Sequence, residues 1–490
     1  ARRLAVANRD EAGATISRAP TTPERDLQPR FSRISREGVM GSSHHGTASL
    51  LAAIALASAC RRTPPSAQAD DADGENLRTS RTAGVSFPAR PKGCDYLVRP
   101  PHAGHLAVTP HLDRGGPSSR ARHTHLTAVG DPSRSMVVQW NTDLPSRSSV
   151  VRFRTPGAAV WQRVEGYSYP LPGAPRVRHH EVHLCGLSPA SAYEYRVGDD
   201  AAEPTWKFHT APSGPEPVNV MIAGDARTHP EVWGQIANAA AREAPDLLLF
   251  TGDAVADGGD MTLWARFFEA SEALLATTPA YWADGNHEGM AAVYYDQFAL
   301  PENGDESHHE HWYAATWGPL RVVVLNDVTV PDADIRGPQR AFLEATLRDV
   351  DRARTPWVVT MHHQPMHTDA IGHRPDVETA RAWGPLFDQY GVDVDLSGHV
   401  HNYESSEPMR ADGTVVEEGL GTRYLVFGGA GAPLYDFHAQ GRWVHHRERS
   451  HGFALARVTR SAFQWEARRA DGSVIERVAL PPRQVSAGAL

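Results

Sequence analysis

Five apolar runs beyond residue 217 each end in a short motif of polar side chains. These motifs are Gly224-Asp225, Gly252-Asp253, Gly285-Asn286-His287-Glu288, His362-His363-Gln364-Pro365 and Gly398-His399-Val400-His401. Stretches with helical periodicity separate the apolar runs, and this alternation indicates an α/β domain. Open α/β sheets bind ligands at the carboxyl ends of their strands. We therefore expect the five motifs to lie close together in space.

The expected elements of this domain follow from the positions of the apolar runs. Strands are predicted over 218–223, 247–250, 321–325, 357–360, 392–396, 423–427, 452–458 and 462–468. Helices are predicted over 231–243, 261–276, 338–350 and 379–390. No internal repeat interrupts this order, which favours one domain.

Each motif alone has an ordinary structural explanation. Asp after a strand caps the next helix, and Gly-Asp or Gly-Asn forms turns. Five successive motifs made of metal-ligand side chains, each at the end of an apolar run, favour a metal site instead. Oxygen and imidazole ligands suit Fe, Mn or Zn rather than a thiolate metal. Two such cations, bridged by a carboxylate, can hold both the attacking and the leaving oxygen of a phosphate.

The stretch 123–212 has a different pattern, in which short β-type runs alternate with turns. The runs are 125–129, 136–140, 150–153, 180–184, 193–197 and 206–210. Their regular spacing and period-2 alternation predict a small antiparallel sandwich. Its expected core residues are Trp140, Leu187, Tyr193 and Tyr195. Gly186-Leu187-Ser188-Pro189 followed by Tyr193–Gly198 resembles a fibronectin type III module.

The five motifs, in their order along the chain, resemble those of the calcineurin-like metallophosphoesterases. Three features resemble the purple acid phosphatase branch: the preceding fibronectin-like module, Gly391-Val392-Asp393 leading to Gly398–Glu404, and the later Gly428–Pro433. The resemblance covers about residues 123–468. It implies a two-sheet α-β-β-α domain over 218–470, preceded by the all-β module.

The resemblance also implies a ligand set for two metal ions. Asp253 would bridge them, Asp225 and His401 would bind the first, and Asn286, His362 and His399 would bind the second. His362 is preferred to its neighbour His363 because Met-His ends the apolar strand in the family. His287 would contact the substrate phosphate or its developing charge.

Two departures from the family pattern concern the first metal. Ala256 stands where purple acid phosphatases carry the tyrosine that binds ferric iron, so the bond that gives the colour is absent and the resemblance does not imply a ferric preference. Arg227 stands where other branches carry a histidine, so the first metal is one ligand short. His229 or a water would supply it, or the metal would bind weakly. Arg227 would contact the phosphate as a guanidinium fork or form a structural salt bridge.

The implied reaction is hydrolysis of a phosphate monoester by in-line attack of a metal-bound hydroxide. His367 and His373 follow the fourth motif, and either could supply the leaving-group proton; we favour His373. One alternative is a phosphodiesterase acting on nucleotides or lipid head groups. Another is a catalytically inactive envelope protein that binds through the fibronectin-like module. The segment 308–311 either lines the pocket or is a solvated loop.

The net charge of −9 and the lack of a long Lys/Arg run argue against a nucleic-acid groove. A small phosphate ester is the expected partner. Residues 47–59 form an apolar run too short to span a bilayer, and they fit the hydrophobic region of a signal peptide. Cys60 follows in the context of a lipoprotein cleavage site, where a lipid anchor could attach. We expect a secreted, periplasmic or envelope-anchored protein.

The remaining boundaries follow from composition. Residues 1–60 form the upstream segment and signal, 61–122 a flexible tether with an irregular continuation, and 471–490 a tail. Cys94 and Cys185 would either pair in an oxidising compartment or remain free thiols.

Overall fold

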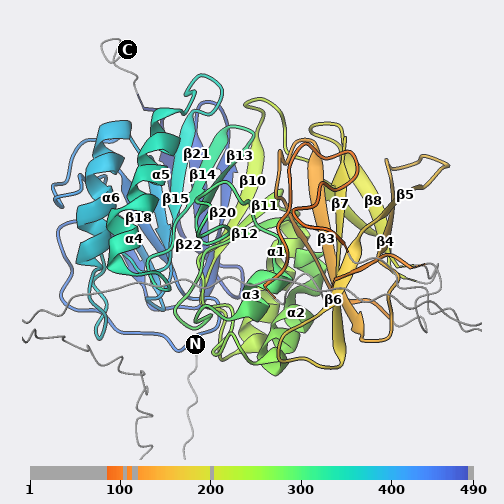
Figure 1. Cartoon of the computed structure of the whole chain (residues 1–490). Coiled ribbons are helices and arrows are strands. Elements are labelled where there is room, and N and C mark those ends of the chain that lie inside the picture. The colour runs from red at the N-terminus through yellow and green to blue at the C-terminus, as the bar shows by residue number, and fades with distance from the viewer. Residues whose placement is uncertain (1–84, 103–107, 113–119, 199–202, 484–490) are drawn as a thin grey trace, which may run out of the picture. The chain divides into compact units, whose positions relative to one another are not determined.

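The structure is a computed structural model of the whole chain, and it describes residues 85–102, 108–112, 120–198 and 203–483 (Figure 1). The expected signal segment and Cys60 lie outside the described residues. Among the residues described, none of the helices combines the length and the apolar character that a membrane crossing requires.

The N-terminal part of the described chain is an all-β sandwich of two antiparallel sheets. The five-stranded sheet has the order β1-β6-β7-β3-β2, and the four-stranded sheet has the order β5-β4-β8-β9. The strands are β1 (Thr109–Pro110), β2 (Arg122–Thr127), β3 (Ser135–Asp143), β4 (Val150–Arg154), β5 (Gln162–Glu165), β6 (Tyr167–Pro170), β7 (Val177–Cys185), β8 (Ala192–Val197) and β9 (Trp206–His209). Along β8 the side chains alternate between buried and half-buried, as a strand with one face on a core requires. Trp140, Leu187, Tyr193 and Tyr195 are all buried in this core, as expected.

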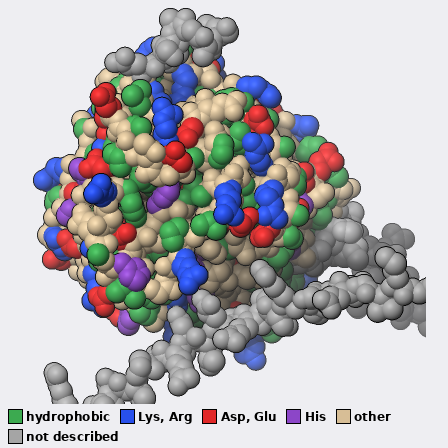
Figure 2. Space-filling model, turned by 90° about the vertical axis from the view of Figure 1, so that its left-hand side faces the viewer, with side chains coloured by type: hydrophobic (Ala, Val, Ile, Leu, Met, Phe, Trp, Pro, Cys, Tyr) green, Lys and Arg blue, Asp and Glu red, His purple; other side chains and the backbone are tan. Residues whose placement is uncertain are grey.

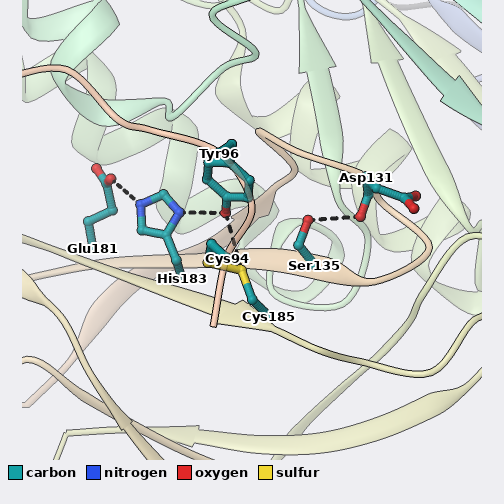
Figure 3. The surroundings of a disulfide bond; sticks show 7 residues. All are labelled: Cys94, Tyr96, Asp131, Ser135, Glu181, His183 and Cys185. Atoms are coloured by element: carbon teal, nitrogen blue, oxygen red, sulfur yellow. Dashed lines mark hydrogen bonds and ion pairs between the residues drawn. A yellow bond between two sulfur atoms is a disulfide. The ribbon is translucent and has the colours of Figure 1, made fainter. Parts of the chain in front are cut away.

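Residues 85–102 pack against the sandwich, although the sequence suggested a tether and irregular surface there. Cys94 forms a disulfide with Cys185 at the end of β7, which spans 91 residues of sequence (Figure 3). Beside it, the Tyr96 hydroxyl lies 2.8 Å from His183 Nδ1. Val98 is buried in the same core. The packed part of the chain therefore begins well before residue 123.

The C-terminal part contains two mixed sheets. One has six strands in the order β12-β11-β10-β20-β21-β22, and the other has seven in the order β13-β14-β15-β16-β18-β17-β19. The first sheet uses β10 (Val218–Ala223), β11 (Leu247–Phe250), β12 (Ala280–Trp282), β20 (Gly452–Val458), β21 (Phe463–Arg469) and β22 (Val474–Leu480). The second uses β13 (Tyr313–Trp317), β14 (Leu320–Val324), β15 (Trp357–Met361), β16 (Val394–Ser397), β17 (Tyr403–Ser406), β18 (Arg423–Phe427) and β19 (Val444–Glu448). The sequence predicted a tail over 471–490, but β22 lies within these residues, so the C-terminal domain extends further than predicted.

Side-chain alternation shows how the two sheets and the helices form layers. Val322 and Val324 of β14 point into the hydrophobic cluster that also contains Ile222 of the other sheet. Val323, between them, points into a second cluster with Leu386 of a covering helix. Successive side chains of a strand face opposite sides, so β14 has one sheet on one face and helices on the other. The predicted two-sheet α-β-β-α arrangement is confirmed.

Six helices flank the described sheets: α1 (Pro230–Glu243), α2 (Met261–Leu275), α3 (Ala292–Gln297), α4 (Asp332–Arg336), α5 (Pro338–Arg348) and α6 (Val377–Tyr390). Asp260 caps α2 by accepting a hydrogen bond from the Thr262 amide, and Asp376 caps α6 in the same way. α6 is followed by its C-cap Gly391, whose φ of 69° is the left-handed conformation common at helix ends. In Figure 1, α4, α5 and α6 lie on the opposite side of the sheets from α1 and α2.

The sandwich and the C-terminal domain are in direct contact through α2. The Thr124 amide of β2 donates to Glu272 Oε1 at 2.9 Å, and the Tyr195 hydroxyl donates to the Ala276 carbonyl at 2.6 Å. Buried residues of both parts belong to one hydrophobic cluster. The two parts therefore share a hydrophobic core and are not joined by a linker alone.

Candidate metal centre

The five polar motifs follow β10, β11, β12, β15 and β16, as the sequence predicted, and their side chains come together at the ends of these strands. Three of the residues involved have left-handed backbones, with φ of 58° at Asp225, 57° at Asp253 and 62° at His399. Non-glycine residues adopt this conformation at a cost, and such residues concentrate at functional sites.

Asp225, Asp253 and His401 form the first group of possible metal ligands. One ligand atom from each lies within 4.8 Å of the others, and all three residues are buried. His401 Nε2 lies 3.4 Å from Asp225 Oδ1. His401 Nδ1 donates to the Pro433 carbonyl at 2.7 Å, which leaves the Nε2 lone pair facing the carboxylates. Below, these three residues are called the first position.

Asn286, His363 and His399 form a second group of possible ligands beside Asp253. Asn286 Oδ1 lies 3.1 Å from His363 Nε2 and 3.0 Å from His399 Nδ1. His363 Nε2 also lies 3.4 Å from Asp253 Oδ1. The other ring nitrogen of His363 donates to the Thr251 carbonyl at 2.8 Å, which orients the ring. These three residues with Asp253 are called the second position.

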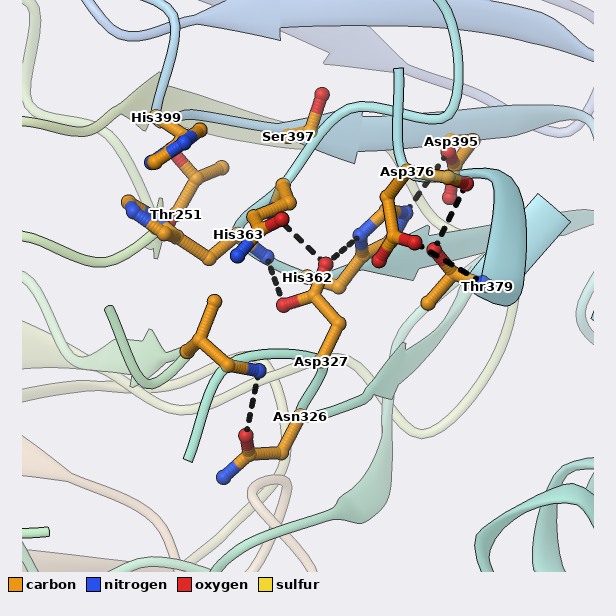
Figure 4. Close-up of polar contacts among 12 residues, drawn as sticks. Thr251, Asn326, Asp327, His362, His363, Asp376, Thr379, Asp395, Ser397 and His399 are labelled. Carbon is orange, nitrogen blue, oxygen red and sulfur yellow. Dashed lines mark hydrogen bonds and ion pairs between the residues drawn. The ribbon is translucent and has the colours of Figure 1, made fainter. Parts of the chain in front are cut away.

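His362 does not face this group, which contradicts the expectation that it would be the ligand. Its Nδ1 lies 2.8 Å from Asp327 Oδ2 and its Nε2 lies 3.0 Å from Asp395 Oδ2, so both nitrogens are occupied (Figure 4). Burial lowers the pKa of His362, but the charges of Asp395 and Asp327 raise it well above its usual value. His362 is therefore an imidazolium held between two carboxylates.

Strand alternation explains which histidine faces the centre. Trp357, Val359 and Met361 of β15 point into the cluster between the two sheets, whereas Val358 points toward the helices. His363 continues the first series. Counting this parity along the apolar run could have identified His363 from the sequence.

Glu288 holds the backbone around Asp253 in place. Its Oε2 accepts hydrogen bonds from the amides of Asp253 and Gly285 at 2.9 and 2.8 Å, and its Oε1 accepts from Ala254 at 2.9 Å. A Cβ on Gly285 would lie 2.2 Å from the Asp253 amide nitrogen, so the turn requires glycine there. The Glu288 carboxylate was not singled out from the sequence, although the motif contains it.

Arg227 and His287 both approach the Asp253 carboxylate. Arg227 Nε lies 3.5 Å from Asp253 Oδ2, and Nη2 lies 3.4 Å from His401 Nε2. His287 Nε2 lies 3.8 Å from the same Asp253 oxygen, while its Nδ1 donates to the Ala256 carbonyl at 2.8 Å. Ala256 thus contributes its backbone carbonyl, which orients the His287 ring.

Of the two histidines proposed as proton donors, His373 lies at the site. Its Nδ1 is 3.1 Å from His399 Nε2, and its ring is 4.5 Å from the ring of Tyr435, which stacks on His401. His367 instead packs against Tyr424, and burial lowers its pKa.

Two other candidates from the sequence lie in different surroundings. His229 Nδ1 lies 3.1 Å from Glu231 Oε1, and the side chain is partly exposed. In the segment 308–311, His308 packs on Trp312, and His311 Nδ1 lies 2.9 Å from the Tyr295 hydroxyl. The contacts of both candidates are with groups outside the two positions.

The donor set fits cations. Asp225 Oδ1 is buried and has no hydrogen-bond partner among the described residues, which leaves a lone pair for an ion. Burial raises the pKa of Asp253, but the His363 charge outweighs it and lowers the pKa below the usual range. Burial opposes charge on His363 as well, yet Asp253 raises its pKa to about 10. Carboxylate oxygens among imidazole and amide groups suit Fe, Mn or Zn.

Comparison with known proteins agrees with this geometry. Residues 219–403 match the family model of the calcineurin-like phosphoesterases, and residues 121–210 match that of the purple acid phosphatase N-terminal domain. The first match lies within the C-terminal domain and ends at the start of β17, and the second covers most of the sandwich.

Relatives and a solved structure extend these matches over most of the described chain. An uncharacterised protein of Mycobacterium tuberculosis is 30% identical over 365 residues, covering 63% of this chain and 69% of its own. Purple acid phosphatase 21 of Arabidopsis thaliana is 27% identical over 312 residues, covering 61% and 69%. A purple acid phosphatase from yellow lupin (Lupinus luteus) seeds has the same fold, with a TM-score of 0.64 at 20% identity, covering 74% of this chain and 75% of its own. This chain therefore belongs to the calcineurin-like phosphoesterases, in the branch that carries the purple acid phosphatase N-terminal domain, and it is a phosphoric ester hydrolase.

Proposed function

We propose that the chain hydrolyses phosphate monoesters at a dinuclear metal centre bridged by Asp253. The observation that carries this proposal is the position of the Asp253 carboxylate. Its Oδ1 lies 3.4 Å from His363 Nε2 in the second position, and the same carboxylate lies within 4.8 Å of the ligand atoms of Asp225 and His401. A single buried carboxylate thus faces both groups of ligands.

In this proposal, Asp225, Asp253 and His401 hold one ion, and Asp253, Asn286, His363 and His399 hold the other. His363 takes the role that the sequence suggested for His362. When bound, such ions lower the pKa of water and stabilise negative charge on phosphoryl oxygens. The metal identity among Fe, Zn and Mn is open.

Residues around the ligands are assigned to binding the phosphoryl oxygens and to donating the leaving-group proton. Arg227 offers N–H donors beside Asp253, and His287 directs its Nε2 toward the same carboxylate; their side chains are 11% and 28% exposed, so both reach the edge of the centre. We assign them to the phosphoryl oxygens, for which a guanidinium fork is well shaped. His373, half-buried next to His399, is assigned to the leaving-group oxygen as a proton donor.

A small substrate fits the charge distribution better than a nucleic acid does. On the face shown in Figure 2, Lys and Arg side chains are interspersed with Asp and Glu side chains instead of forming one continuous basic surface. Nucleic-acid binding requires such a basic surface. The purple acid phosphatases among the relatives support a monoester as the first substrate to test.

Export from the cytoplasm is part of this proposal. The Cys94–Cys185 disulfide supports it, because structural disulfides persist in oxidising compartments. Residues 47–60 support export separately, because their sequence resembles the hydrophobic region of a signal peptide followed by a cleavage site.

Replacing Asp253 by Asn tests the proposed centre. Asp253→Asn removes the bridging charge but preserves the side-chain shape, so we expect a loss of more than about 100-fold in metal-dependent hydrolysis of a chromogenic phosphate monoester. Asp412→Asn, in an exposed turn, serves as the matched control and should retain full activity. Circular dichroism checks that both variants fold. Unchanged activity of Asp253→Asn would refute the bridging role.

A further inference from the structure

Arg227 occupies the space in front of the first position. Its Nε lies 3.5 Å from Asp253 Oδ2 and its Nη2 lies 3.4 Å from His401 Nε2. The His401 nitrogen that it faces is the lone-pair nitrogen, since Nδ1 donates to the Pro433 carbonyl. The guanidinium therefore contacts two of the three residues that would hold a metal ion there.

The second position has a different set of neighbours. Its ligand atoms come from Asp253 Oδ1, an amide oxygen and two imidazoles. Each of these groups is neutral or anionic once it binds an ion, because a ligating imidazole is deprotonated. The guanidinium of Arg227 keeps its positive charge, because arginine is not deprotonated in proteins. A cation entering the first position therefore meets a fixed like charge, and only movement of the Arg227 side chain relieves it.

The surroundings of Arg227 make this contact persistent. The side chain is only 11% exposed, and its Nε is buried without a hydrogen bond, so charge alone holds Nε next to Asp253, while Nη2 makes a long contact of 3.4 Å with His401. A metal ion that competes for the same carboxylate can displace a guanidinium held in this way.

We propose that Arg227 is a built-in competitor of the first metal ion, so that the two positions load unequally: the second binds its ion tightly, and the first binds an exchangeable ion that must displace the guanidinium. This inference rests on the proposed dinuclear centre. It makes Arg227 the residue that determines metal stoichiometry. After displacement, the guanidinium remains beside the centre, where it is available to the phosphate.

Titration of the metal-free full-length protein with Mn²⁺ tests this without measuring turnover. Free Mn²⁺ is followed by electron paramagnetic resonance, which also distinguishes isolated ions from coupled pairs. For the wild type we expect one tight equivalent and a second that binds at least tenfold more weakly. For Arg227→Gln we expect the second equivalent to tighten at least tenfold, with coupled pairs appearing at two equivalents.

Two further variants keep the outcomes separate. Arg227→Met repeats the test if the Gln variant is poorly folded, and Arg336→Gln, an exposed arginine on α4, should titrate as the wild type does. Two equal affinities in the wild type, or an unchanged second affinity in both Arg227 variants, would overturn the inference alone. If the wild type bound no more Mn²⁺ than Asp253→Asn does, the dinuclear centre itself would be overturned.

Discussion

His362 and His363 are neighbours in the chain, yet they have opposite surroundings. His363 faces Asn286 and Asp253 with one nitrogen, whereas His362 is enclosed between Asp327 and Asp395. The first arrangement leaves a nitrogen directed at the proposed ions. The second is a buried ion pair that supports the end of β15.

Substituting each histidine in turn should separate these roles. His363→Ala should lose most bound metal and more than about 100-fold of the activity. His362→Ala leaves two buried carboxylates unpaired and should lower the free energy of unfolding by about 3–5 kcal/mol. Metal analysis and denaturant unfolding of both proteins provide the measurement. If His362→Ala lost the bound metal and His363→Ala retained it, the assignment of His363 would be wrong.

At the scale of elements, apolar runs could be read from the sequence and polar strands could not. Leu247–Phe250 is buried throughout as β11, and its bounds match the predicted run. β17, Tyr403–Ser406, escaped notice because its sequence is polar. It is nevertheless buried, since Glu404 accepts hydrogen bonds from the Thr368 hydroxyl and the Asp369 amide. Residues distant in sequence supply these bonds, and no local pattern reveals them.

In the candidate site, too, residues within local motifs could be predicted from the sequence, whereas a contact between distant residues could not. The motifs at the strand ends identified Asp225, Asp253, Asn286, His399 and His401 as residues that the structure brings together. The contact of Arg227 with His401 spans 174 residues of sequence and depends on how two sheets meet. The sequence therefore left the role of Arg227 open between a salt bridge and a phosphate contact.

At the scale of the whole molecule, the sandwich joins the catalytic domain through buried histidines. His125 Nε2 hydrogen-bonds the Gln297 carbonyl at 2.7 Å, and the Ala299 amide donates to Gln139 Oε1 at 3.1 Å. Burial, together with the charges of Arg122 and His125, lowers the pKa of His123 to about 4. The histidine is therefore neutral in the folded protein at neutral pH.

This neutral histidine should make the protein sensitive to acid. Because the folded pKa of His123 lies below the unfolded value of about 6.5, the unfolded chain takes up the proton first as the pH falls. Stability is thus unaffected above about pH 6.5 and decreases between there and about pH 4, by up to about 3 kcal/mol for this one group.

Denaturant unfolding of the wild type and of His123→Asn, each at pH 7.5 and pH 5, measures this effect. The variant should lose less stability between the two pH values than the wild type does. His438→Asn, an exposed histidine, is the control and should behave as the wild type. Equal losses in all three proteins would exclude a contribution from His123.

The central claim is that Asp253 lies between two metal ions, and anomalous diffraction from crystals saturated with Mn²⁺ or Zn²⁺ tests it most directly. We predict two anomalous peaks, one among Asp253, Asn286, His363 and His399 and the other among Asp225, Asp253 and His401. A peak beside His362, or no peak next to the Asp253 carboxylate, would contradict the account.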